Sequence, residues 1–355
     1  MTGLSLPFLL LIFLGSAAVI WVAGIKLSDS TDVLSTRLHL GQALGGLILL
    51  AIATNLPEIA ITGSAALGHN LGIAIGNILG GIAVQTVVLV VLDVFGVRGE
   101  RGLTYRAASL QLVLEGMLVI AVLVLSVAGT RLPQALIAYR VAPAGLLIAV
   151  LWVAGLLLLN RAGHGLPWQE SGEAPGGQEH QRGHAKQQKE RDASRKRIGT
   201  GRTALVFAVS ALATLVAGGL LERSGDAISG HLGLSGVLFG ATVLAGATSL
   251  PELSTGLASV RLGDYKLAMS DIFGGNAFLP VLFLFATLLS GSAVLPQAHD
   301  TDVYLTALGA LLTVVYVVGL IFRPQRRIAH MGIDSLVVLV LYGLGVAGLV
   351  AITRS

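Results

Sequence analysis

Long apolar stretches alternate with short polar segments along almost the whole chain. Ten of these stretches are long enough to cross a hydrocarbon core, which requires about 20 residues in a helix. They lie near residues 5–34, 40–67, 70–97, 103–128, 136–160, 203–228, 234–260, 265–290, 302–322 and 332–352. The pattern predicts an all-α membrane protein with ten transmembrane helices.

A long polar segment separates the first five stretches from the last five. Residues 161–202 are rich in Gly, Gln, His, Lys and Arg and contain few apolar residues, a composition typical of a flexible linker. Three histidines in it, His164, His180 and His184, could suggest a metal site. Their spacing is irregular and the chain has no cysteine, so a solvated tether is favoured. We therefore divide the chain into five-helix units 1–160 and 203–355.

A sequence repeat occupies the second apolar stretch of each unit. Leu-Ala-Ile-Ala-Thr-Asn-Leu-Pro-Glu at 50–58 returns as Leu-Ala-Gly-Ala-Thr-Ser-Leu-Pro-Glu at 244–252, with seven of nine residues identical. At the same offset of 194 residues, the pair Gly80-Gly81 coincides with Gly274-Gly275. Because five spans separate equivalent points and five is odd, the two units are expected to cross the membrane in opposite directions. This is the inverted-repeat plan of many secondary transporters.

Each copy of the repeat places a carboxyl group inside an apolar span. An ionised side chain near the bilayer centre costs on the order of 3 kcal/mol or more, so Glu58 and Glu252 are functional candidates. Each follows a proline that cannot donate a helical hydrogen bond, so each helix should break there and release backbone carbonyls near Ala51 and Ala245. Discontinuous helices that carry acids at matched positions predict the ion site of a transporter.

Other oxygen-bearing side chains lie close to the two glutamates. Thr54 and Thr248 precede them by four residues, about one helical turn, and would share their helix face, although back-bonding to the preceding turn is an alternative for threonine. Hard cations prefer oxygen ligands, and two acids would neutralise one divalent ion. Further oxygen-bearing candidates come from the same segment and from the next helix of each unit. They are Asn55, Ser249, Asn77, Gln85, Asp271 and Asn276.

Composition excludes several other classes of protein. The chain has 355 residues, 54% hydrophobic and 12% charged, and no cysteine, which rules out disulfides, thiolate zinc sites and cysteine nucleophiles. Its histidines fall in loops, at span edges or in the linker, so an intramembrane hydrolase is disfavoured. We expect no enzyme activity, no cofactor and no nucleic-acid partner. The expected partners are inorganic cations and the lipid bilayer, and a homo-oligomer is left open.

The distribution of basic residues predicts orientation. With the N-terminus outside, nineteen Lys and Arg residues fall on the inner side, nine of them between Arg161 and Arg202, and four fall outside. Positive charge concentrates in cytoplasmic segments of membrane proteins. We therefore expect an inner-membrane protein with a cytoplasmic linker and both termini outside. The first apolar run, Met1–Gly24, has no basic residue before it, which favours a spanning helix over a cleaved signal peptide.

These motifs resemble those of the calcium/cation antiporter superfamily, which includes the sodium/calcium exchangers. The superfamily's repeats begin with Gly-Thr-Ser-x-Pro-Glu, matched here by Thr54, Asn55 and Glu58 and again by Thr248, Ser249 and Glu252. The resemblance implies two alpha-repeats, at 41–86 and 235–280. It also implies that the paired glutamates and central carbonyls hold calcium while flanking serines help to hold sodium.

The second part of each repeat departs from the superfamily. Its usual Gly-Asn-x-x-Gly-Ser-Asn has glycine in place of serine at Gly81 and Gly275, and the later Asn or Asp is Gln85 in one unit and Leu279 in the other. Sodium coupling is therefore less supported than divalent binding, and Gln85 and Asn55 look like the cation/proton branch. Asp271 could replace part of the missing oxygen.

The sequence thus predicts an antiporter that exports Ca²⁺ in exchange for Na⁺ or H⁺ by alternating access. The alternative is a non-transporting membrane scaffold or cation sensor that kept the exchanger fold. Gly81 and Gly275 are the features that support this alternative.

Overall fold

The computed structural model describes residues 4–37, 52–163, 165, 167, 199–234 and 236–354 of this almost entirely helical chain. Within them, eight helices are long and apolar enough to cross a membrane. Most of the predicted linker 161–202, including His164, His180 and His184, and residues 41–51 of the first predicted alpha-repeat lie outside the described residues.

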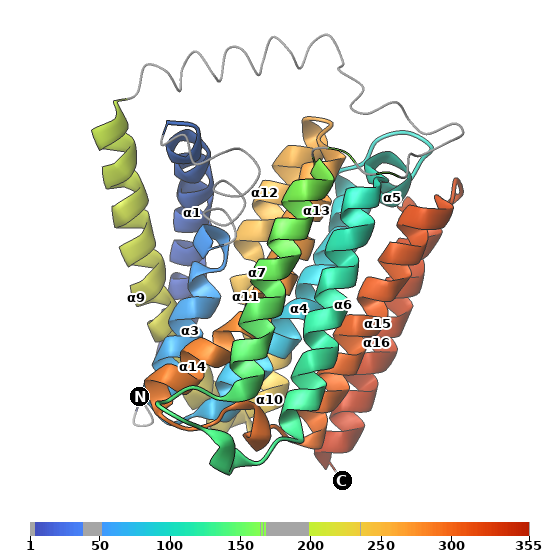
Figure 1. Ribbon diagram of the computed structural model, residues 1–355. Coiled ribbons are helices and arrows are strands. Elements are labelled where there is room, and N and C mark those ends of the chain that lie inside the picture. Colours follow the sequence, from blue (N-terminus) through green and yellow to red (C-terminus); the bar gives the residue numbers. More distant parts are fainter. Residues whose placement is uncertain are drawn as a thin grey trace.

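The helices run roughly along one common direction (Figure 1). In the first half they are α1 (Leu6–Arg37), α3 (Leu56–Leu67), α4 (Leu71–Phe95), α5 (Leu103–Ala107), α6 (Leu110–Thr130) and α7 (Pro143–Gly163). In the second half they are α9 (Thr200–Leu232), α10 (Gly236–Phe239), α11 (Ala245–Thr248), α12 (Leu250–Arg261), α13 (Tyr265–Phe278), α14 (Leu282–Ser290), α15 (Asp300–Phe322) and α16 (Ile333–Arg354).

Several predicted spans are interrupted. The span at 234–260 consists of α10, a π-helical segment (η3, Gly240–Leu244), α11 and α12. The span at 265–290 changes to a 3₁₀ turn at Leu279–Val281, where Pro280 cannot donate a helical hydrogen bond. The span predicted at 136–160 begins only at Pro143, after a short 3₁₀ turn. Hydropathy located these segments but not their breaks.

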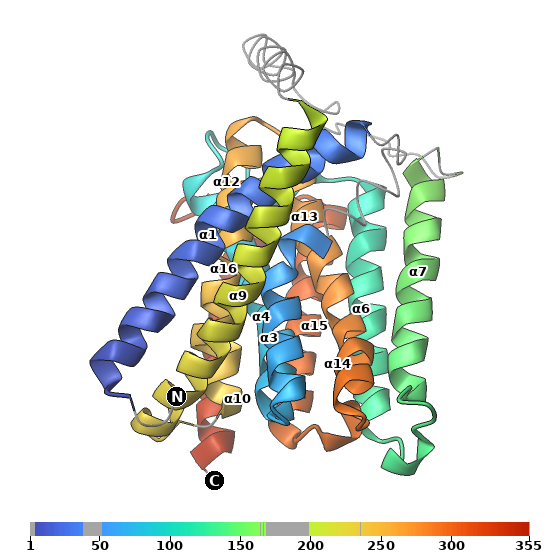
Figure 2. The same ribbon diagram turned by 90° about the vertical axis from the view of Figure 1, so that its left-hand side faces the viewer.

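Helices α4 and α13 form the centre of the bundle. The apolar windows of these two spans are 72% and 67% buried, against 17% for α16 and 28% for both α7 and α9. The outer helices carry many exposed leucines and valines, as expected for surfaces that face lipid. The long helices α1 and α9 pack along one another at one side of the bundle (Figure 2).

Each half contains a tight two-residue turn before its last helix. Residues Ala138 and Val141 pair across a two-residue turn, and Ile328 and Met331 pair in the same way between β1 (Arg327–Ile328) and β2 (Met331–Gly332). Both central residues of each turn have positive φ, the geometry of a type I′ hairpin turn. The first turn lies at the lower end of the bundle in Figure 1 and the second at the upper end.

Candidate functional site

The two Leu-Pro-Glu segments fold alike, each at a helix break. Helices α3 and α12 begin at Leu56 and Leu250, with proline in the first turn of each. The preceding residues have similar backbone angles, with φ −92° and ψ 16° at Asn55 and φ −80° and ψ 2° at Ser249. Proline is tolerated at this position because its missing N–H is not needed there. The breaks agree with the expectation from sequence, and they set Glu58 and Glu252 in the first turn of their helices.

The two glutamates are buried and close to each other. Glu58 is 0% and Glu252 2% exposed, and their carboxyl groups lie near enough to repel each other when both are ionised. Gln85 Nε2 donates to Glu58 Oε1 at 3.4 Å, and Thr248 interacts with the same carboxyl group from the other half. The site is therefore shared between the two halves of the chain.

Several oxygens around the glutamates lack a partner. Over the described ranges, no hydrogen-bond donor is found for Glu58 Oε2, for either oxygen of Glu252, for Gln85 Oε1 or for Asn276 Oδ1. Neither glutamate forms an ion pair with a described basic residue. A buried ionised carboxyl group without compensation costs several kcal/mol, and oxygens of this kind are the ligands that hard cations prefer. The arrangement suits a cation.

The hydroxyl groups beside the glutamates are held by local hydrogen bonds. Thr248 Oγ1 and Ser249 Oγ donate to the Ala245 carbonyl at 3.1 and 2.8 Å. Asn55 Nδ2 donates to Thr54 Oγ1 at 3.4 Å. Because a donating hydroxyl keeps its lone pairs, the back-bonded Thr248 and Ser249 can still face a cation with their oxygens.

The expectation that a carbonyl is freed at Ala245 is wrong. That carbonyl accepts the Ser249 N–H at 3.1 Å in addition to the two hydroxyls. Proline removes the donor that would reach the carbonyl four residues earlier, which for Pro251 is Ala247. Ala51, the equivalent candidate in the first half, lies outside the described residues.

The secondary candidates are placed differently from one another. Asn276 Nδ2 donates to Thr86 Oγ1 at 3.1 Å, which joins α13 to α4 beside the acids. Asn77 is fully buried, and no hydrogen bond is found for its amide within the described residues. Asp271, only partly buried, accepts from Thr255 Oγ1 at 3.2 Å and lies near enough to Glu252 to repel it.

Thr86 and Thr255 were missed by the sequence reasoning. Thr255 Oγ1 also lies 3.2 Å from the Glu252 carbonyl oxygen. Thr255 follows Glu252 by about one helical turn, just as Thr248 precedes it by one turn, so the same spacing argument could have selected it. No signal in the repeat marks Thr86, because the corresponding residue of the second half is Pro280.

The glycines of α4 and α13 have two different roles. Gly80 lies so close to the backbone of Ala241 in η3 that a Cβ would not fit, so it permits close helix packing. Gly275 instead faces side chains of the other half. A Cβ there would lie 3.3 Å from Asn55 Nδ2 and 3.4 Å from Gln85 Oε1. The space beside Gly275 is thus occupied by two amides from the first half.

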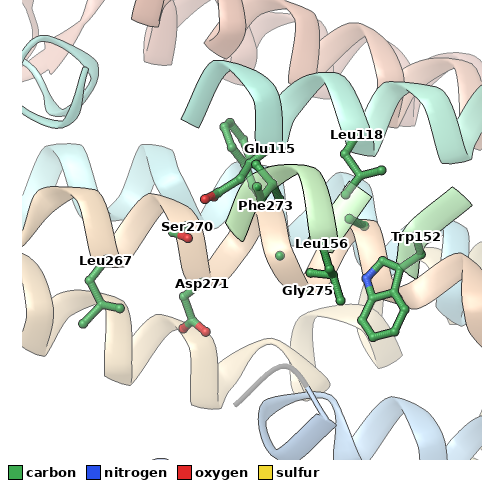
Figure 3. Close-up of a pocket in the computed structure, with 12 residues that line it drawn as sticks. Glu115, Leu118, Trp152, Leu156, Leu267, Ser270, Asp271, Phe273 and Gly275 are labelled. Atoms are coloured by element: carbon green, nitrogen blue, oxygen red, sulfur yellow. The ribbon is translucent and has the colours of Figure 1, made fainter. Parts of the chain in front are cut away.

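Two other acids within spans, Glu115 and Asp93, have hydrogen-bond partners of their own. Glu115, 4% exposed, accepts from Gln111 Nε2 at 3.3 Å and lines a cavity of about 40 Å³ between α6, α7 and α13. In Figure 3 the carboxyl group of Glu115 lies beside Ser270, whereas the carboxyl group of Asp271 points away from Glu115. Asp93 accepts from Gly332 N at 2.6 Å and Ser335 Oγ at 2.8 Å, so it joins α4 to the start of α16.

An apolar helical bundle with two buried acids at matched helix breaks is typical of ion-transporting membrane proteins. The chain belongs to the sodium/calcium exchanger protein family, whose model matches residues 8–160 and 202–351. This membership places it among membrane cation exchangers rather than enzymes.

Individual relatives agree with this family. The inner membrane protein YrbG of Escherichia coli (strain K12) is 26% identical over 294 residues, which cover 82% of this chain and 83% of that protein. The putative antiporter CaxA of Alkalimonas amylolytica is 34% identical over 127 residues, 35% of this chain and 40% of that protein.

Solved structures show the same fold. The H⁺/Ca²⁺ exchanger CAX superposes with a TM-score of 0.65 at 14% identity, covering 98% of this chain and 86% of that one. The sodium-calcium exchanger NCX_Mj, soaked with 2.5 mM Na⁺ and 10 mM Sr²⁺, gives a TM-score of 0.59 at 16% identity, with 97% and 99% coverage. These likenesses establish the exchanger fold for this chain.

Proposed function

We propose that the protein is a secondary active antiporter that binds Ca²⁺ between Glu58 and Glu252 and exports it in exchange for Na⁺ or H⁺. The observation that carries this proposal is the pair of buried carboxyl groups, contributed by both halves, with three oxygens that no described donor satisfies. Two ionised carboxyl groups match the charge of one divalent cation, and family membership supplies the class of transport.

The proposed architecture is ten transmembrane helices in two inverted five-helix repeats. It is supported by the two broken helices at an offset of 194 residues and by the two type I′ turns at opposite ends of the bundle. An internal two-fold relation of this kind puts the substrate at the interface of the repeats. There the halves can rock about Glu58 and Glu252 and expose the site to each side in turn.

Competition for the same two acids would couple the two ions. The carboxyl groups must be neutralised before the site can lose its contact with water, because an empty charged site is costly to bury. One Ca²⁺, two Na⁺ or two protons would each satisfy this requirement. An empty carrier would not change its facing, so the cations move only in exchange.

The amides beside Gly275 support protons over sodium as the counter-ion. The superfamily resemblance places a sodium-binding serine at this position, whereas here Asn55 and Gln85 fill the space. At Gly81 the nearest described atom to an added Cβ would be a methyl carbon of Leu279 at 3.5 Å, so within the described residues no oxygen replaces the second serine. We therefore propose H⁺ exchange as the principal mode.

Transport in inverted membrane vesicles tests this function. Ca²⁺ uptake would be measured with a pH gradient and then with a Na⁺ gradient, the other being clamped. Glu58→Gln and Glu252→Gln should each abolish uptake, whereas Glu100→Gln, an exposed acid remote from the site, should not. Unchanged uptake in either site variant would sink the assignment. Ca²⁺ binding by the wild type without uptake would instead favour a cation sensor or scaffold.

A further inference from the structure

A cavity of about 710 Å³ lies at the end of the bundle that carries the β1–β2 hairpin. It opens between the loop that follows α4 and the segment that joins α15 to α16 (upper end of Figure 1). Its volume is within the range of about 300–1,000 Å³ that is typical of ligand pockets. Nothing in the proposed exchange of cations uses this cavity.

The walls of the cavity are strongly basic. Arg101, Arg326, Arg327 and His330 line it, and Glu100 is the one acid among the lining residues. In the part of the chain that the structure describes, Arg327 pairs with Asp93 at 3.8 Å, but neither Arg101 nor Arg326 forms an ion pair. Three arginines against one glutamate give the lining an excess of positive charge.

Arg101 has no acidic partner among the described residues. Its guanidinium carbon lies 4.6 Å from the centre of the Tyr105 ring, and that of Arg323 lies 5.2 Å from the same centre. Two cations therefore share one ring and repel each other. Arg101 Nη1 is shielded from solvent and has no hydrogen-bond acceptor among the described residues. A bound anion would relieve both unfavourable features.

Hydrogen bonds of Arg327 connect the two sides of the cavity. Arg327 donates to the carbonyls of Gly99 at 2.7 Å and Asp93 at 2.9 Å, and also to that of His330. These bonds tie the loop after α4 to the β1–β2 hairpin. Arg327 thus links the loop that carries Arg101 to the hairpin segment that carries Arg326 before a ligand binds.

We propose that this cavity binds a phosphate group through Arg101 and Arg326. Guanidinium groups match phosphate oxygens in charge and in geometry. The phosphate could come from an anionic phospholipid or from a free phosphate compound. The position at the bundle end, next to the exposed side chains of Ile328 (48%) and Phe322 (78%), suits a lipid headgroup with its acyl chains along the helices.

The test uses the purified full-length protein with added phosphatidylglycerol, phosphatidylcholine or inorganic phosphate. Thermal stability and the number of retained lipids, the latter by native mass spectrometry, are measured for the wild type, Arg326→Gln and Arg101→Gln/Arg326→Gln. Phosphatidylglycerol should stabilise the wild type more than phosphatidylcholine does. Its affinity should fall roughly 10- to 30-fold in the double variant, since each basic residue contributes about 1 kcal/mol.

A matched control is the double variant Arg131→Gln/Arg140→Gln, which removes two exposed arginines at the other end of the bundle. It should respond to phosphatidylglycerol as the wild type does. Stabilisation by inorganic phosphate that is lost in Arg326→Gln would identify a free phosphate compound as the ligand. An equal response of the wild type and both Arg326 variants to all three additions would overturn the proposal. Arg326 is exposed, so its substitution does not disturb the fold.

Discussion

At the residue scale, the central feature is that side chains of each half lie beside residues of the other half. Gln85 and Asn55 of the first half fill the space beside Gly275 of the second, and Thr248 of the second approaches Glu58 of the first. Glu58 is therefore approached by a side chain of the other repeat as well as by Gln85 of its own. This explains why the repeat motif could predict the acids but not their full surroundings.

Replacing Gln85 by Leu should weaken Ca²⁺ transport without unfolding the protein. The variant removes the amide that donates to Glu58 at 3.4 Å and an oxygen that no described donor satisfies. For a hydrogen bond of this length we expect a loss of about 1 kcal/mol, or roughly a fivefold higher KM for Ca²⁺ in vesicle uptake. Gln111→Leu removes a similar amide from Glu115, outside the site, and should leave KM unchanged. Equal effects of the two substitutions would argue against a ligand role for Gln85.

Serine at the two departing glycines should have unequal effects. Among the described atoms, Gly81→Ser meets a Leu279 methyl carbon at 3.5 Å, an ordinary contact, so the variant should fold and transport Ca²⁺ normally. Gly275→Ser places Cβ within 3.4 Å of two amide atoms that already occupy the space, and should lower Ca²⁺ uptake several-fold. The comparison is made by Ca²⁺ uptake at matched expression. A Gly275→Ser variant that gained Na⁺-driven uptake and kept its H⁺-driven rate would contradict the view that the amides of Asn55 and Gln85 exclude sodium.

At the scale of elements, the prolines of the repeat were informative and the remaining breaks were not predicted. Pro57 and Pro251 mark helix starts in both the sequence and the structure. The π-helical segment Gly240–Leu244 has no proline and no polar run to mark it in the sequence. Helix α4 packs closely against this segment at Gly80. Hydropathy reports the medium around a segment and is insensitive to such tertiary contacts. The apolar spans were therefore easier to predict than their internal geometry.

The close approach of α4 to η3 predicts a stability difference between two glycines of one helix. At Gly80 an added methyl group would overlap the Ala241 backbone, and overpacking of this kind typically costs about 1–3 kcal/mol. At Gly72, in the first turn of α4, no described atom lies within 4 Å of an added Cβ, so alanine should fit without strain. Thermal unfolding in detergent should show Gly80→Ala below and Gly72→Ala at or above the wild type. A Gly80→Ala variant with wild-type stability would contradict this packing.

The contact between α1 and the break in the second repeat predicts an effect on transport. A Cβ on Gly24 would lie 2.6 Å from the Pro251 Cβ, so Gly24→Val must push α1 away from the segment that positions Glu252. We expect a strong loss of Ca²⁺ uptake. Gly15→Val lies on the same helix, where no described atom is within 4 Å of an added Cβ, and serves as the control. Comparable uptake by the two variants would show that α1 does not constrain the site.

At the scale of the whole molecule, the opposed orientation of the two halves can be tested with the type I′ turns. Tyr139 and Ala329 occupy the same position in the two turns and are both exposed, Tyr139 fully. The chain has no cysteine, so Tyr139→Cys and Ala329→Cys each introduce the sole thiol. The excess of basic residues near Ala329, including Arg326 and Arg327, predicts by the positive-inside rule that this end lies in the cytoplasm. A membrane-impermeant maleimide should therefore label Tyr139→Cys in intact cells and Ala329→Cys only after permeabilisation.

Labelling of both from the same side would refute the inverted arrangement, and with it the expectation that equivalent helix breaks meet face to face at one cation. Labelling of Ala329→Cys alone in intact cells would agree with the inverted arrangement but reverse the predicted orientation. Both termini would then lie in the cytoplasm, and the proposed direction of Ca²⁺ transport would be reversed.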